Sequence, residues 1–89
     1  MTSESAALMI QLKDAIRIAK EHAADLLGEA PYSVAEFERE DYNGRPVWVI
    51  TLAAATNQFQ GTALEYRRFF VDENSGELLA MKIREFAFQ

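Results

Sequence analysis

The sequence contains no cysteine and a single histidine among its 89 residues, which removes several kinds of chemistry at once. Disulfides, thiolate catalysis and cysteine-based zinc sites are excluded. A catalytic triad needs a base, and the only histidine, His22, lies on the flank of a predicted helix, as a surface or boundary residue would. One histidine also provides no spaced pair of imidazoles for a metal. We therefore expect that the chain is not an enzyme and has no catalytic residue, cofactor or metal.

Basic residues, glycines and long apolar runs are also scarce. Nine Lys and Arg against fourteen Asp and Glu give a net charge of −5, so a general nucleic-acid binder, which must neutralise phosphates, is not expected. The four glycines never form the pattern of a phosphate-binding loop. No run approaches the ~20 apolar residues that a membrane-spanning helix needs. The acidic start, Met-Thr-Ser-Glu-Ser, lacks the basic region of a secretory signal, so we expect a cytoplasmic protein.

The remaining composition is sufficient for one small folded domain. Hydrophobic residues make up 49% of the chain and include six phenylalanines, which argues against disorder. A chain of this length forms a single domain, here residues 1–89, whose core is thin. A partner that covers spare apolar surface is therefore expected.

Residues 11–27 have the periodicity of an amphipathic helix. Apolar residues recur at steps of three and four, and form a stripe of Leu12, Ala15, Ile16, Ala19, Ala23, Leu26 and Leu27. The small alanines would let this helix sit close to a sheet. Gly28 is placed for a left-handed C-cap, and Pro31 prevents continuation. Residues 1–10 are either an extended arm or a capped start of the helix.

Residues 33–54 predict a β-hairpin around Asn43-Gly44, because a type I′ turn needs positive φ at both central residues. The expected opposite pairs are Tyr42 with Arg45, Arg39 with Trp48, Phe37 with Ile50, and Ala35 with Leu52. Alternation then directs an apolar set toward the helix: Ala35, Phe37, Trp48, Ile50 and Leu52. The other face carries Glu36, Glu38, Glu40, Val47, Val49 and Thr51. The Arg39–Trp48 pair predicts a cation–π contact.

The C-terminal part of the chain predicts a second hairpin. Its strands are residues 65–72 and 77–84, and Gly76 takes the left-handed position of the turn. A bulge is expected near this loop. We interpret Asp72-Glu73-Asn74 as a structural turn rather than a calcium loop, which would need a later bidentate glutamate.

The two hairpins are joined by residues 53–64, which lose strand alternation. We predict a long connection there, with Phe59 near its tip. The tail, which alternates Phe86 and Phe88, either extends the last strand or covers an edge. The predicted fold class is α+β, with one N-terminal helix packed on a four-stranded antiparallel sheet made of two hairpins.

Two features are candidates for contact with a protein partner. Glu36, Glu38 and Glu40 form an acidic strand face, which is either a solubility feature or a docking surface for a basic protein. Phe59 is a loop aromatic that either contacts a partner or folds back as a plug. A homodimer through a sheet edge or through the phenylalanine tail is a further arrangement that the sequence allows.

Three segments resemble the PepSY domain in their order and spacing. They are Ile10-Gln-Leu-Lys-Asp-Ala15-Ile-Arg-Ile-Ala19-Lys, Gly44-Arg-Pro-Val-Trp-Val-Ile-Thr-Leu52 and Phe70-Val-Asp-Glu-Asn-Ser-Gly76-Glu-Leu-Leu. That family shows a helix with Ala-Ile-x-x-Ala, a strand Gly-x-x-Val-Trp-x-Val and an ending Val-Asp-x-x-Thr-Gly-Glu-Val-Leu. The resemblance spans most of residues 10–80. It implies a helix on an antiparallel sheet, and a module that inhibits, as in the propeptides of thermolysin-type proteases.

The Trp-bearing strand and the Val-Asp-x-x-(Ser/Thr)-Gly ending are also similar to small bacterial immunity proteins, which are cytoplasmic. We therefore expect a non-catalytic protein-binding module of PepSY-like type, regulatory or inhibitory toward a peptidase or another protein. An immunity protein that neutralises a toxin is the first alternative. A small-ligand-binding accessory subunit is the second.

Overall fold

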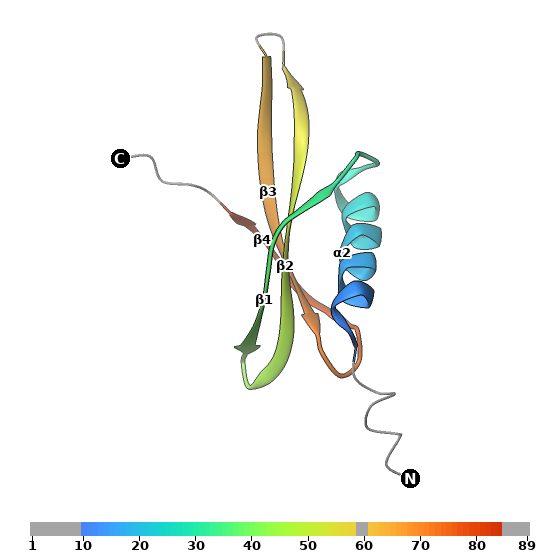
Figure 1. Ribbon diagram of the computed structural model, residues 1–89, viewed down its shortest axis with the longest axis vertical. Helices are drawn as coiled ribbons and strands as arrows, with labels where there is room; N and C mark the ends of the chain where they lie inside the picture. The colour runs from blue at the N-terminus through green and yellow to red at the C-terminus, as the bar shows by residue number, and fades with distance from the viewer. Residues whose placement is uncertain (1–9, 59–60, 85–89) are drawn as a thin grey trace, which may run out of the picture.

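The structure, a computed structural model, describes residues 10–58 and 61–84, with the side chains of 10–54 and 65–83. Within these residues the elements are α2 (Leu12–Leu27), β1 (Ser33–Tyr42), β2 (Arg45–Gln58), β3 (Gly61–Asp72) and β4 (Leu78–Arg84). The strands lie in the order β1-β2-β3-β4, each antiparallel to the next, with α2 against one face (Figure 1). The predicted fold is confirmed. The predictions for residues 1–9, Phe59 and the Phe86/Phe88 tail fall outside the described residues.

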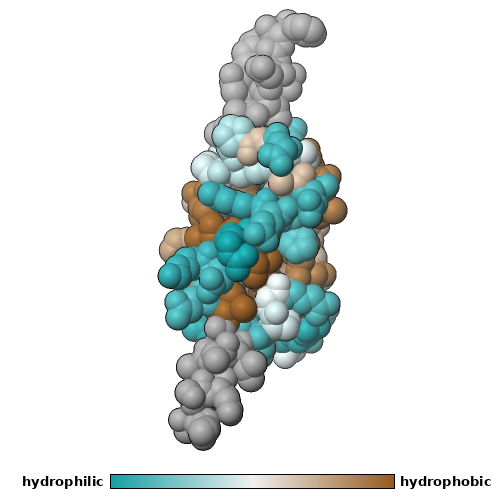
Figure 2. Space-filling model, turned by 90° about the vertical axis from the view of Figure 1, so that its right-hand side faces the viewer, coloured by the Kyte–Doolittle hydropathy of each residue, from teal (hydrophilic) through white to brown (hydrophobic). Residues whose placement is uncertain are grey.

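The helix α2 packs on the sheet through its smallest residues. Ala15, Ala19 and Ala23 are completely buried, because a methyl group lets the helix approach the strands closely. From the side on which α2 lies, hydrophilic residues cover the middle of the molecule and hydrophobic ones show beside them (Figure 2). The prediction is wrong for the C-terminal end of the apolar stripe, because Leu26 and Leu27 are 56% and 39% exposed rather than buried against the sheet.

The ends of α2 only partly follow the predicted capping. Gly28 has the predicted positive φ, +101°, but its ψ of 164° lies outside the left-handed helical region. Its N–H donates to the Ala24 carbonyl oxygen at 3.1 Å and closes the last turn. At the other end, Gln11 is an N-cap without a side-chain hydrogen bond. Within residues 10–58 and 61–84, no helical segment combines the length and apolar character that a bilayer crossing demands.

The first hairpin has the predicted two-residue turn. Asn43 and Gly44 have φ of 54° and 83°, as a type I′ turn requires. The predicted register is confirmed for Tyr42 with Arg45, Arg39 with Trp48, and Phe37 with Ile50. It is wrong for Ala35, because a β-bulge between Val34 and Glu36 adds a residue to β1 and places Val34 opposite Leu52. Val34 therefore packs against the helix-side core, and Ala35 is exposed.

The predicted irregular connection at residues 53–64 is wrong. β2 and β3 continue to pair from Ala54 with Glu65 to Gln58 with Gly61. Within the described residues, β1 pairs with β2 only as far as Ala53, and β4 pairs with β3 only as far as Tyr66, so the rest projects as a two-stranded ribbon (Figure 1). Alternation of side chains reflects the burial of one face, whereas a backbone ladder needs no such pattern.

The second hairpin follows the prediction closely. β3 ends at Asp72 and β4 begins at Leu78. Gly76, in the turn between them, has φ of 78°, the predicted left-handed value. The register shifts between Phe70 and Val71, which is the expected bulge next to the loop.

The face of the sheet toward α2 carries the larger core. Its buried strand residues are Ile50, Leu52, Phe69 and Val71. Trp48 packs at the edge of this core, and its Nε1 donates to the Ile10 carbonyl oxygen at 2.8 Å. Phe37 lies on the same face but is 55% exposed, which corrects the prediction that it meets the helix. The reason is that α2 packs mainly on β2, β3 and β4, whereas Phe37 lies on β1.

The opposite face of the sheet contains a second, smaller core. Val47, Val49 and Phe70 are buried there, on the face that also carries the predicted glutamates. The Tyr42 ring packs on Phe70 with centroids 5.0 Å apart. The charged ends of Arg68 and Lys82 lie 5.2 Å from the centroid of the same Phe70 ring. Long cationic side chains therefore cover this face in place of a helix.

Candidate functional site

β1 is an exposed edge strand of the sheet. β1 stands at one end of the strand order, and among the described residues no strand pairs with its outer side. Every residue from Ala35 to Asp41 is exposed, and this stretch contains four acids and a single cation. We call residues 35–41 the acidic edge. Such an edge presents backbone N–H and C=O groups with which another strand can pair.

The structure brings two of the predicted contact residues to a single cation. Glu36, Glu38 and Glu40 share the face away from α2, and Glu38 and Glu40 lie 3.5 and 3.3 Å from Nη2 of Arg68 on β3. The pKa of Glu38 is raised, first because Glu40 shares a hydrogen bond with it and then because burial and the Glu40 charge disfavour ionisation. The positive charge of Arg68 lowers this pKa, but by less than Glu40 and burial together raise it. The fourth predicted residue, Phe59, lies outside the described residues.

Arg39 links the acidic edge to the turn that follows β3. Its guanidinium lies 5.4 Å from the Trp48 ring centroid, which confirms the predicted cation–π contact. Its Nη2 also donates to Oε1 of Glu73 at 2.9 Å. The Glu73 side chain is only 4% exposed, so its charge needs this partner. The sequence concealed this contact, because an acid in a polar turn is expected to be solvated.

Asp72 is the second buried acid that the sequence did not reveal. Its Oδ1 accepts the backbone N–H groups of Asn74 and Ser75 at 2.7 and 2.9 Å, and its Oδ2 accepts Nε of Arg45 at 2.9 Å. Burial raises the pKa of Asp72, but the hydrogen bonds from Ser75 and Asn74 and the charge of Arg45 together outweigh burial, so the pKa is lowered. Asp72 is therefore an organising residue of the turn.

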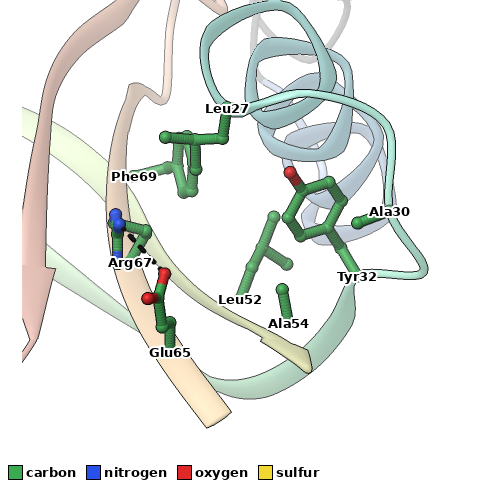
Figure 3. A pocket seen from close by; sticks show the side chains of 8 residues that line it. All are labelled: Leu27, Ala30, Tyr32, Leu52, Ala54, Glu65, Arg67 and Phe69. Carbon is green, nitrogen blue, oxygen red and sulfur yellow. Dashed lines mark hydrogen bonds and ion pairs between the residues drawn. The ribbon is translucent and has the colours of Figure 1, made fainter. Parts of the chain in front are cut away.

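A hollow of about 190 Å³ opens at the C-terminal end of α2 (Figure 3). It is lined by Leu27, Ala30, Tyr32, Leu52, Ala54, Glu65, Arg67 and Phe69. The Tyr32 hydroxyl donates to the Gly28 carbonyl oxygen at 2.6 Å, and Nη2 of Arg67 lies 3.3 Å from Glu65. The volume is close to that of a cavity that admits one benzene molecule, ~150 Å³, and below the ~300–1,000 Å³ of usual small-molecule sites.

Two further polar features of the described residues are His22 and a second hollow. His22 is half-buried on α2. A second hollow, of about 300 Å³, is lined by Arg39, Glu40, Asp41, Pro46 and Glu73. Its most buried carboxylate is the one paired with Arg39. Across the described part of the chain, no three side chains of His, Cys, Asp or Glu are grouped so as to hold a metal ion. The absence of catalytic, cofactor and metal residues stays a prediction.

Comparison of the chain with protein-family models, with curated proteins and with solved structures found no match. The resemblance to the PepSY domain therefore stays a prediction from the sequence. The acidic edge is the surface on which a functional proposal can be based.

Proposed function

We propose that the chain is a non-catalytic protein-binding module of PepSY-like type that holds a protein partner along the acidic edge of β1. The observation that carries this proposal is a strand edge, unpaired among the described residues, on which every side chain from Ala35 to Asp41 is exposed and most are acidic. A free edge and a local excess of one charge are together the features of a surface that takes up an extended segment.

The backbone and the side chains of this edge favour the same kind of partner. The free edge offers N–H and C=O groups to an extended segment of another protein. The acids attract a basic surface and accelerate encounter, and the net charge of −5 acts in the same direction. These charges also disfavour pairing of β1 with β1 of a second copy, because like charges would lie opposite one another. The partner is therefore a protein with an exposed basic segment.

Two classes of partner fit this description. The sequence resemblance favours a peptidase or another protein that the module inhibits or regulates. An acidic edge equally favours a basic toxin, in which case the chain is an immunity protein. Gene position separates the two, since a toxin-like reading frame immediately upstream supports immunity and an isolated gene contradicts it. The role of a small-ligand-binding subunit has less support, because the hollow beside α2 is small and its polar groups already have partners.

Capture with matched variants tests the protein-binding proposal. The triple variant Glu36→Gln/Glu38→Gln/Glu40→Gln removes three of the four acids of the edge without placing a cation beside Arg68. Immobilised wild-type chain is expected to retain a specific protein from an extract of the source cells, and the variant is expected to lose it. Mass spectrometry identifies the retained protein, and calorimetry with the purified partner then measures the change in affinity.

The control removes the same charge elsewhere. Glu21→Gln/Asp25→Asn/Glu29→Gln neutralises three exposed acids on α2 and in the loop after it. This control should retain the same protein as the wild type. Equal capture by all three chains would show that the acidic edge does not bind the partner. Circular dichroism shows whether each variant is folded.

A further inference from the structure

The two edges of the sheet are complementary in charge and in hydrophobicity. β4, the edge strand opposite β1, alternates basic residues with apolar ones: Met81, Lys82, Ile83 and Arg84. Ile83 is 61% exposed and Phe37 on β1 is 55% exposed, so each edge carries one large exposed apolar side chain. We propose that β4 of a second copy adds to the acidic edge, so that copies associate head to tail through one continuous antiparallel sheet. This association goes beyond the proposed function, because it occupies the edge when no other partner is present.

The backbone groups of β1 that point outward can be identified. The two-residue turn makes Tyr42 and Arg45 a hydrogen-bonded pair, so the next pair, Asp41 and Pro46, is not bonded across β1 and β2. This is consistent with the Pro46 carbonyl oxygen, which faces the other way and accepts the N–H of Glu73 at 2.9 Å. By alternation, the N–H and C=O groups of Phe37 and Arg39 also point to the outer side.

The same alternation can be followed across the sheet to β4. The Glu73 N–H points to β2, and the Asp72 N–H points the other way and donates to the Glu77 carbonyl oxygen at 2.8 Å. Even-numbered residues of β3 therefore bond to β4, and the pair Arg68 with Lys82 is one of these bonded pairs. It follows that Met81 and Ile83 turn their N–H and C=O groups to the outer side of β4.

One register satisfies the backbone and the side chains together. When Phe37 lies opposite Ile83 of the second copy, the opposed pairs are Phe37 with Ile83, Arg39 with Met81, Glu38 with Lys82, and Glu36 with Arg84. The first two pairs join the outward-pointing backbone groups. They also lie on the face that α2 covers in each copy, because Ile50, Trp48 and Phe69, which lie opposite Phe37, Arg39 and Met81, belong to the helix-side core. The pair of Glu38 with Lys82 lies on the other face and joins opposite charges, which favours the pairing.

The strand directions allow this addition without inverting the second copy. Three successive antiparallel pairings make β4 antiparallel to β1 within the sheet. A second copy can therefore continue the sheet with its own α2 on the same side. Because the two contacting surfaces differ, the contact has no two-fold symmetry, and further copies can add at both ends.

The electrostatics of the edge favour an additional cation. The pKa of Glu38 is raised by Glu40, with Arg68 as an insufficient counter-charge. Lys82 is exposed on its own strand, where its ammonium lies 5.2 Å from the Tyr42 and Phe70 ring centroids. An ammonium from a second copy beside Glu38 would relieve the repulsion between the two glutamates.

Sedimentation velocity of charge-swapped variants tests the proposal. Wild-type chain should show a mass average that rises with concentration and passes beyond that of a dimer. The single variants Glu38→Lys and Lys82→Glu should each stay monomeric, because like charges then face one another. An equimolar mixture of the two variants should associate again, since the altered edge of each complements the altered edge of the other. The double variant Glu38→Lys/Lys82→Glu should also associate.

The controls are Lys20→Glu and Glu21→Lys, which change exposed charges on α2 and should associate like the wild type. Amide hydrogen exchange of the wild type gives a second measurement that needs no variant. Protection should rise with concentration at Phe37, Arg39 and Ile83. A wild type that stays monomeric up to its solubility limit overturns the proposal, as does association that neither single variant weakens. Loss in both variants without recovery in the mixture also overturns it. None of these results depends on capture of another protein.

Discussion

The Asn43-Gly44 turn and the turn from Asp72 to Glu77 lie at the same end of the sheet, yet they are held in different ways (Figure 1). The Asn43-Gly44 turn depends on its own backbone, and nothing lies within 4 Å of a Cβ added at Gly44. The turn from Asp72 to Glu77 depends on a buried carboxylate, and a Cβ at Gly76 would meet Ile18 Cδ1 at 3.3 Å and Ile10 Cδ1 at 3.4 Å. Local sequence is sufficient to specify the first turn, whereas the second also requires the rest of the fold.

The largest effect is expected from removal of the carboxylate that organises the second turn. Asp72→Ala leaves the N–H groups of Asn74 and Ser75 without their acceptor and Arg45 without its buried partner. We expect the free energy of unfolding to fall by about 2–3 kcal/mol. Urea unfolding followed by circular dichroism measures the change. Asp72→Asn keeps an acceptor for the two N–H groups and should cost less. Equal losses in the two variants would contradict this account of the turn.

A smaller effect is expected from alanine at the two turn glycines. Both glycines have positive φ, so each substitution costs roughly 1 kcal/mol in backbone strain. Gly76→Ala must in addition displace Ile10 or Ile18, whereas Gly44→Ala meets open space. Gly76→Ala should therefore lower the free energy of unfolding about twice as much as Gly44→Ala. Thermal and urea unfolding of both variants measure the ratio, and a larger loss at Gly44 would contradict the comparison.

The smallest effect concerns the dependence of stability on pH. The folded pKa of Asp72 lies below its ordinary value of 3.8, so the unfolded chain takes up the proton first as the pH falls. The stabilisation from Asp72 is therefore complete above the ordinary pKa and is lost as the pH falls through the folded pKa. Urea unfolding of Asp72→Asn should show a weaker decline in stability below about pH 4 than the wild type. An unchanged decline would mean that Asp72 is not preferentially ionised in the folded chain.

Much of the fold could be predicted because it depends on local rules. The helical stripe, the Asn43-Gly44 turn and Gly76 each follow from spacing or from the φ that a residue must adopt. The bulge at Ala35 could not be predicted, because Val34 and Ala35 are both apolar and either could be assigned to the face toward the helix. The ribbon beyond Ala53 was missed for a related reason, because paired backbones need no alternation of side chains.

Less of the candidate site could be predicted. Alternation indicated that Glu38 and Glu40 share a face, but their common partner Arg68 lies two strands away, and only the sheet order brings it there. The burial of Asp72 and Glu73 was also hidden, because acids in a turn usually face water. The match between the two edges becomes visible only when the register of every strand is known.

Trp48 is the only tryptophan in the chain, and it lies where three parts of the molecule meet. Its indole N–H donates a hydrogen bond to the Ile10 carbonyl oxygen, and the Arg39 guanidinium lies over its ring. The side chain also packs against the helix-side core. The protein therefore carries one indole fluorophore, placed directly behind the edge on which both binding proposals depend. A strand that draws Arg39 away from the indole changes the environment of that fluorophore alone, so occupancy of the edge can be followed optically without a label.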